Sequence, residues 1–405
     1  MITPTVEVFF DDVTPTDISC YAHSWDLRRG RAREFDEITA GVGKVGLRNH
    51  SGTFVPYDVV AGGSALLDET GEELLDEAGE LLLDESASVF ATNIRPGKRM
   101  RVTVLGFVVF DSSIDDWNYW YDPSGRADAE IEAVDALADL AARRLSAHTA
   151  TSEQRAGERL TALFARPEIN YTGAVDFDRG VDRLQGNAIA EGESLLTEAQ
   201  LIARTDRGYF FASRTNTVTY RDRRAAAVVE SSIEFSDDCS ETPLTMIGPE
   251  FGRESWHPRV TVQRLGGTVQ VADRSGGTNI RTLALSGLLL LSDFYSANLA
   301  EFLADTYSEP RTRIRSLIVN LDGISTAQAE AVVALELGDV VTVTWTPEGI
   351  SGEVTQELVV EGIRHSKSNS TGYLVELQLS QRVQSGVFTL DSATLGVLDQ
   401  SALAY

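Results

Sequence analysis

Short runs in which apolar and polar residues alternate lie at both ends of the chain, and this period-two pattern restricts the fold more than any other feature. Near the N-terminus the runs are residues 6–10, 44–48 and 100–104, separated by Gly, Pro, Asn and Asp. In the last third they are residues 260–262, 340–345, 357–360 and 373–379. Such alternation predicts strands in a sheet with one buried and one solvated face. We therefore expect a mainly β fold with a β-barrel or sandwich at each end.

The middle of the chain has a different period. Apolar residues recur at three- and four-residue steps from Ile131 to Leu145, which predicts a helix over residues 128–145. Thr151 with Gln154 resembles a capping box before a second helix that Pro167 ends. A third helix is expected over residues 194–205, followed by a hairpin of residues 209–211 and 218–220. These elements predict a small α+β module.

Two more helices interrupt the C-terminal strands. One is expected to carry Leu299, Phe302, Leu303 and Tyr307 and to end at Pro310, and the other runs from the capping box Ser325 and Gln328 to Leu337. With 405 residues, two to four domains are expected. We predict a first β-barrel domain at 1–122 with an acidic repeat insertion at 64–88, an α+β module at 123–235, a second β-barrel domain with two helices at 236–385, and a C-terminal tail segment at 386–405.

The acidic insertion repeats the tetrapeptide Leu-Leu-Asp-Glu from positions 66, 74 and 82, with Gly71 and Gly79 between the copies. The glycines suit hairpin turns, so we expect a three-stranded meander. Clustered carboxylates could collect Ca²⁺, but the segment lacks the ordered ligand spacing of a calcium loop. Burying so many unpaired charges would cost several kcal/mol each, so the insertion should project from the core.

Charge limits the classes of partner. The chain has 61 Asp and Glu against 35 Lys and Arg, a net charge of -26, which repels the phosphates of nucleic acids and disfavours dedicated nucleic-acid binding. A small basic cluster is expected to pair with neighbouring acids rather than hold a ligand. It consists of Arg95, Lys98, Arg99 and Arg101.

Cys20 and Cys239 lie far apart in the sequence, without the spacing of a zinc site or a disulfide scaffold, so free thiols are expected. The N-terminus lacks a signal-peptide pattern, and the longest apolar run, residues 288–291 with its flanks, is too short for a bilayer. We expect folding in a reducing cytoplasm and no stable membrane insertion.

No set of residues has the spacing of a catalytic, cofactor-binding or metal site, so we predict a protein that is not an enzyme and has no cofactor. Residues 41–46 match G-x-G-x-x-G, but a strand and a turn follow instead of the helix that binds a pyrophosphate. The histidines occur singly, without an H-E-x-x-H motif. They are His23, His50, His148, His257 and His365. Three adjacent carboxylate pairs are expected in solvated loops rather than as a glycosidase pair. They are Asp11-Asp12, Asp115-Asp116 and Asp237-Asp238.

Aromatic residues crowd at Trp117-Asn118-Tyr119-Trp120-Tyr121. They could stack on sugars or form an interface. Because the cluster falls at the expected boundary between the first β domain and the helical module, we favour an interpretation in which it fills that junction.

Several short segments, in a fixed order along the chain, carry a family resemblance. The N-terminal segments are Arg28-Arg29-Gly30-Arg31-Ala32-Arg33-Glu34-Phe35 with Thr39-Ala40-Gly41, Gly46-Leu47-Arg48-Asn49 with Phe54-Val55-Pro56, and Asn93-Ile94-Arg95-Pro96-Gly97-Lys98-Arg99. The later ones are Phe210-Phe211 with Val218-Thr219-Tyr220-Arg221-Asp222-Arg223, Arg281-Thr282-Leu283, Ser286-Gly287-Leu288, Leu337-Gly338-Asp339, Val360-Glu361-Gly362-Ile363, and Phe388-Thr389-Leu390-Asp391 with Gly396-Val397-Leu398-Asp399. Together they resemble the minor tail proteins of actinobacterial long-tailed bacteriophages, of the tail-hub (baseplate hub) type. The acidic repeat departs from this pattern, because related chains have a short connector there.

The resemblance implies two tail-tube-like barrels flanking a smaller module, and a homotrimeric ring at the tail tip in the virion, assembled in the host cytoplasm. The ring would join the tail tube or distal tail protein to receptor-binding and other minor tail proteins, contact the tape measure protein, and surround DNA that passes without specific binding. Three alternatives stay open: a sixfold distal tail ring, a receptor-binding, carbohydrate-binding tail protein, and a cell-wall hydrolase embedded in the tail.

Overall fold

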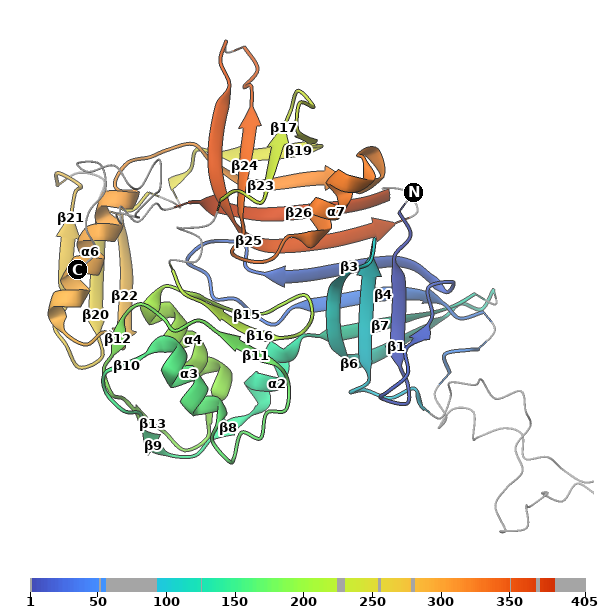
Figure 1. The fold of residues 1–405 in the computed structure, drawn as a ribbon, viewed down its shortest axis with the longest axis horizontal. Helices are drawn as coiled ribbons and strands as arrows, with labels where there is room; N and C mark the ends of the chain where they lie inside the picture. Colours follow the sequence, from blue (N-terminus) through green and yellow to red (C-terminus); the bar gives the residue numbers. More distant parts are fainter. Residues whose placement is uncertain are drawn as a thin grey trace, which may run out of the picture.

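The computed structural model describes residues 2–50, 52–55, 93–124, 126–223, 230–253, 256–277, 281–349, 351–368 and 372–382. Within them the fold is mainly β with a smaller α+β module, as predicted (Figure 1). The acidic insertion at 64–88 and the tail segment at 386–405 lie outside the described residues. In the part of the chain that is described, none of the helices has the length and hydrophobicity needed to cross a membrane.

The N-terminal strands form one half of a large sheet, in the order β3-β4-β7-β6-β5-β1-β2. Alternation works as expected: Val6 and Val8 of β1 are fully buried, while Glu7 between them accepts a hydrogen bond from Arg101 at 2.8 Å. The strands are β1 (Thr5–Phe9), β2 (Thr16–Asp17), β3 (Ala22–Gly30), β4 (Val42–Arg48), β5 (Arg99–Val104), β6 (Phe107–Tyr121) and β7 (Ala127–Val134).

The C-terminal strands form the other half of the sheet, in the order β18-β17-β24-β25-β26-β23-β19. Helix α7 (Thr326–Ala334) and a 3-10 turn (Leu321–Gly323) connect β23 to β24. The strands are β17 (Ile233–Ser236), β18 (Thr242–Pro243), β19 (Met246–Glu250), β23 (Arg313–Asn320), β24 (Val340–Trp345), β25 (Val354–Ser368) and β26 (Gly372–Gln381).

The two halves are joined by one long strand. The first part of β25 pairs with β24, and its second part pairs with β3, from Gly362 opposite Gly30 to Lys367 opposite Trp25. In the described residues this pairing makes a single 14-stranded sheet whose path runs from β18 to β2. The sheet is open, so the two predicted barrels are sheet halves that share a continuous ladder and one apolar core.

The α+β module packs beside this sheet (Figure 1). Helices α3 (Ala156–Phe164) and α4 (Leu195–Asp206) and the hairpin β15 (Tyr209–Ala212) and β16 (Val218–Arg221) match the prediction, with α2 (Ala136–Ala142) before them. The remaining strands are short: β8 (Arg144–Leu145), β9 (His148–Thr149), β10 (Gln154–Arg155), β11 (Val175–Phe177), β12 (Arg183–Leu184), β13 (Ala188–Ile189) and β14 (Glu193–Ser194).

The helix expected over residues 128–145 is wrong in its first half. Residues 127–134 form β7, which pairs with β4 on one side and β6 on the other. Ala129, Ile131 and Ala133 alternate inward on this strand, whereas Glu132 faces outward beside Lys44. Partners on both edges outweigh the local helical spacing. The helix α2 starts only after Asp135, whose side chain caps it.

Two predicted helix ends also differ. The second helix starts at Ala156 rather than after Thr151, because Glu158 accepts the hydrogen bond from the Arg155 amide at 3.1 Å. The capping box of Ser325 and Gln328 is confirmed. However, α7 ends at Ala334 rather than at Leu337, and the residues that follow enter a polar network described below.

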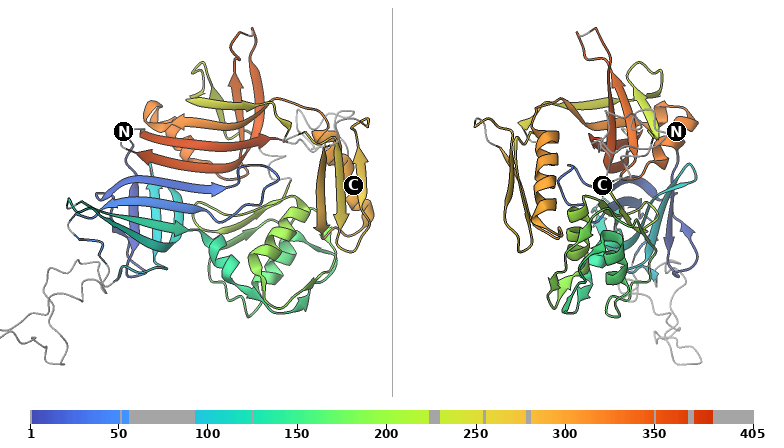
Figure 2. Two further views of the ribbon diagram at one scale, coloured as in Figure 1. Left: turned by 180° about the vertical axis from the view of Figure 1, so that it is seen from behind. Right: turned by 60° about the vertical axis from the view of Figure 1, so that its left-hand side comes forward.

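A separate unit, here called the satellite subdomain (residues 259–307), follows β19. It comprises β20 (Arg259–Arg264), β21 (Gln270–Asp273), β22 (Thr282–Leu288) and α6 (Asp293–Tyr307), the helix predicted to carry Leu299 to Tyr307. Its three strands form their own sheet over a second apolar core. The helix α6 lies between this small sheet and the rest of the molecule (Figure 2).

Candidate functional site

Glu361 lies at the point where β25 changes partners. The pairing of β25 with β26 shifts register between Val360 and Gly362, so Glu361 is the extra residue of a β-bulge. Its side chain is fully buried. The carboxylate accepts hydrogen bonds from Arg31 Nε at 2.6 Å, Tyr209 Oη at 2.9 Å and Ser380 Oγ at 2.6 Å. One bulged residue therefore ties both halves of the sheet to the α+β module.

Gly30 allows this close approach. Its φ is +90°, a conformation that residues with a side chain rarely adopt. A Cβ at Gly30 would lie 2.3 Å from the carbonyl oxygen of Glu361 and 2.8 Å from Leu337. The amide of Arg31 then donates to that same carbonyl at 2.8 Å. The Arg28-to-Phe35 and Val360-to-Ile363 segments, far apart in the sequence, thus meet at one contact.

The loop of residues 31–41, here called the junction loop, connects β3 to β4 and reaches the other two units. Gln200 of α4 donates to the Ile38 carbonyl at 2.9 Å. Tyr307 of α6 donates a hydrogen bond to Glu34, and the rings of Phe35 and Tyr307 lie 5.1 Å apart. The junction loop therefore contacts the sheet, the module and the satellite subdomain.

Burial dominates the electrostatics here. It raises the pKa of Glu34, and the hydrogen bond from Tyr307 offsets this only in part. Burial also raises the pKa of Tyr209 well above its ordinary value, and the nearby Glu361 carboxylate adds to the effect. For Arg31, burial opposes the charged form, but attraction to Glu361 outweighs it and raises the pKa. The pair of Arg31 and Glu361 is thus a buried ion pair that also has hydrogen-bonded neighbours.

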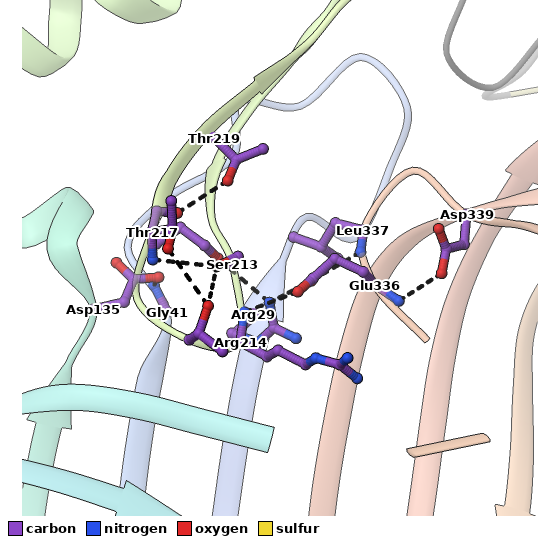
Figure 3. Close-up of polar contacts among 12 residues, drawn as sticks. Arg29, Gly41, Asp135, Ser213, Arg214, Thr217, Thr219, Glu336, Leu337 and Asp339 are labelled. Carbon is purple, nitrogen blue, oxygen red and sulfur yellow. Dashed lines mark hydrogen bonds and ion pairs between the residues drawn. The ribbon is translucent and has the colours of Figure 1, made fainter. Parts of the chain in front are cut away.

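A second polar network lies where the hairpin turn after β15 meets the sheet (Figure 3). Arg29 of β3 donates to Glu336 at 2.5 Å, and the Arg214 amide donates to the other Glu336 oxygen at 2.8 Å. The Arg214 guanidinium donates to the Ala334 carbonyl at 2.8 Å, and the Glu336 amide donates to Asp339 at 2.8 Å. These bonds explain why α7 ends where it does: the residues after it hold the module's hairpin.

Asp135 fixes the entry to the module. It accepts hydrogen bonds from the Gly41 amide at 2.7 Å and the Leu137 amide at 2.9 Å. Asn216, in the β15–β16 turn, accepts from the Ala136 amide at 2.7 Å. Burial raises the pKa of Asp135 to about 7.

Between the junction loop, α4 and α6 lies a cleft of about 470 Å³. Phe35 of the loop, Arg207 at the end of α4 and Phe302 of α6 line it, as do the last residues of β26. Two carboxylic acids, Glu34 and Glu361, lie near this cleft, and two such acids in one site can perform acid–base chemistry. However, Glu361 is fully buried and three donors occupy its carboxylate, so a substrate has no access to it. The arrangement is suited to holding elements together.

The residues singled out from the sequence lie mostly elsewhere. Three members of the basic cluster pair with acids as expected: Lys98 with Asp12, Arg99 with Asp111, and Arg101 with Glu7. Residues 42–46 of the glycine motif lie in the strand β4 (Val42–Arg48). Both cysteines are free and exposed.

Two of the carboxylate pairs lie in loops as expected: Asp11 accepts from the Val13 and Thr14 amides, and Asp237 from the Thr346 amide. The loop prediction is wrong for Asp115-Asp116, because this pair lies, exposed to solvent, on the strand β6.

Two of the five histidines line one small pocket, and His365 is buried elsewhere. His365 is buried against the Tyr373 hydroxyl at 3.1 Å, and burial lowers its pKa to about 3. His23 and His50 line a small surface pocket of about 220 Å³ with Arg48. In the described ranges no three His, Cys, Asp or Glu side chains gather as a metal site would require.

The interpretation of the aromatic cluster is wrong. Trp117 stacks with Phe54 at 6.1 Å inside the N-terminal half of the sheet, and Trp120 and Tyr121 are exposed at the end of β6. The other end of β6 contacts the module, where Arg214 lies over the ring of Phe107 at 5.6 Å.

Sequence reasoning did not identify the junction residues. Glu361 and Arg31 were quoted only for a resemblance, although a Glu inside the apolar run Val359-Val360-Glu361-Gly362-Ile363 is a usable signal. An acid there needs a buried partner.

No family model matches the sequence, and no curated protein matches it. Several solved structures are similar in fold, among them two tail proteins. The 43 kDa tail protein of prophage MuSo2 from Shewanella oneidensis has a TM-score of 0.60 at 12% identity, covering 94% of this chain and 97% of that protein. A tail protein from Neisseria meningitidis has a TM-score of 0.58 at 12% identity, covering 94% of this chain and 96% of that protein. The chain therefore has the fold of phage tail proteins.

Proposed function

We propose that this protein is a structural component of a phage tail tip, in which copies form a hub ring. The ring joins the tail tube to the tip and receptor-binding proteins and surrounds the DNA exit path. The observation that carries the proposal is the match in fold to two tail proteins over nearly the whole length of this chain and of theirs.

The junction supports a mechanical role. The bulge at Glu361 and the network of Glu336 connect the two sheet halves and the module through buried polar contacts. Force applied to one unit therefore reaches the others through the junction rather than through a free linker. Three copies in a closed ring would place six β halves around the axis, to match a sixfold tail tube approximately.

The partners follow from that position. We propose contacts with further copies of the chain, the tail tube or distal tail protein, the tape measure protein and receptor-binding proteins. The protein would act in the virion at the tail tip after assembly in the host cytoplasm. The net charge of -26 suits a channel through which DNA passes without binding.

One observation favours a second candidate, a carbohydrate-binding tail protein. Trp120 is 53% and Tyr121 is 62% exposed, and exposed aromatic rings can stack on sugars. A sixfold distal tail ring is the remaining alternative and differs from the hub mainly in copy number.

The test is the rotational symmetry of this protein's density in images of the tail tip. Threefold density supports the hub, sixfold density moves the protein to the distal ring, and single copies on fibres favour the carbohydrate-binding candidate. Zymography on host cell wall should show no hydrolysis. Activity lost on mutation of one carboxylate or histidine would contradict the non-enzymatic role.

A further inference from the structure

The cleft between the junction loop, α4 and α6 lies where the described chain ends. Ser380, Gln381 and Arg382, at the end of β26, are part of its lining. Figure 2 shows β26 running toward the satellite subdomain. Residues 383–405 continue from this point. We propose that the cleft binds the chain's own C-terminal segment, through Phe388-Thr389-Leu390-Asp391.

The cleft combines apolar surface with one arginine, Arg207, that has no hydrogen bond or ion pair to its side chain within the described residues. Arg207 has a left-handed backbone (φ 58°) at the end of α4, and its guanidinium stacks on the ring of Phe302 at 4.8 Å. The other lining arginines have carboxylate partners among the described residues: Arg31 with Glu361, Arg204 with Glu37, Arg223 with Asp182 and Arg382 with Glu357. The Arg207 side chain makes no hydrogen bond or ion pair within the described residues. Burial lowers its pKa, although Glu34 and the Tyr hydroxyls nearby act in the opposite direction.

The C-terminal segment has the complementary chemistry. Residues 383–405 contain no Lys or Arg, whereas Asp391 and Asp399 are acidic. Apolar residues precede the first acid directly, in Phe388-Thr389-Leu390-Asp391. A ring and a leucine can cover Phe35 and Phe302, and the Asp391 carboxylate can accept the bidentate pair that a guanidinium donates.

The length of the connecting chain and the volume of the cleft fit binding of Phe388-Thr389-Leu390-Asp391, not of the whole C-terminal segment. Five residues lie between Arg382 and Phe388, so six chain steps separate the two, and an extended chain spans at most about 3.3–3.6 Å per step, roughly 20 Å in total. The volume of about 470 Å³ is that of a site for a few side chains. A docked motif would join α6 to α4 and the junction loop, and so fasten the satellite subdomain to the sheet.

Hydrogen exchange of the full chain tests this proposal. Amides of residues 388–391 should be protected relative to an unstructured peptide. Arg207→Gln should reduce that protection by about tenfold or more, and so should the tail variant that combines Phe388→Ala with Asp391→Asn. A change of about tenfold is what the loss of one charge-assisted hydrogen bond produces. Exchange at residues 31–38 should rise in parallel. The tail variant leaves the folded body unchanged, so misfolding cannot produce the result.

Two control variants match these changes. Arg179→Gln removes an exposed arginine that pairs with Glu158, and Asp399→Asn removes the second acid of the tail. Both should leave protection at residues 388–391 as in the wild type. Three results would overturn the proposal: unprotected amides in the wild type, protection that survives Arg207→Gln, or protection that depends on protein concentration. The last would assign the cleft to a second copy.

Discussion

Glu361→Ala removes the acid of the buried pair at the junction. The Glu361 side chain is 0% and the Arg31 side chain 14% exposed, so the guanidinium would keep its charge with little access to water. The Tyr209 and Ser380 hydroxyls would also lose their acceptor. Removing one partner of a buried pair costs about 3–5 kcal/mol. This is a large share of the about 5–15 kcal/mol by which most proteins are stable.

Urea unfolding followed by tryptophan fluorescence measures this loss of stability. The urea concentration at the midpoint of the first unfolding transition should fall by about 1 M or more. The matched control is Asp26→Ala. Arg364 and Asp26 form a bidentate pair at 2.8 and 2.6 Å on the same β3–β25 ladder, but both side chains are 45% exposed. Such exposed pairs contribute about 1 kcal/mol or less. Similar losses for Glu361→Ala and Asp26→Ala would refute the reasoning that burial makes the junction pair important.

Three further changes have defined outcomes. Gly30→Ala should lower the melting temperature well beyond Gly97→Ala, because both have a positive φ but only Gly30 faces backbone at 2.3 Å; equal losses would show that the junction relaxes easily. The pKa of Asp135 is raised to about 7 by burial, so the folded state binds a proton that the unfolded state releases, and this group lowers stability as the pH rises from about 4 to about 7. Asp135→Asn should flatten that part of the profile in urea titrations, and parallel profiles would contradict the assignment. Deleting residues 65–86 should leave a soluble protein with nearly the same melting temperature, and an insoluble product would mean that the insertion belongs to the core.

Features that depend on neighbours in the sequence were predictable. The helix α4, the β15–β16 hairpin and the capping box of Ser325 and Gln328 follow from apolar spacing and local hydrogen bonds. The alternation of Val341, Val343 and Trp345 gave β24 for the same reason, since a strand with one buried face repeats every two residues.

Features that depend on partners distant in the sequence were not predictable. Residues 127–134 have both helical and alternating spacing, and only the flanking strands β4 and β6 decide between them. The satellite subdomain likewise became a separate unit because its strands pair with each other and not with the large sheet.

The sequence by itself determined the mainly β class, the helical module and the positions of the elements with clear apolar spacing, because apolar periodicity is a local property. Tertiary structure alone decided that the two β halves share one sheet and that Glu361 lies at their bulge, 330 residues from its ion-pair partner Arg31. The physical reason is that a buried charge is stable only beside its counterion, and chain folding, not sequence spacing, brings the two together.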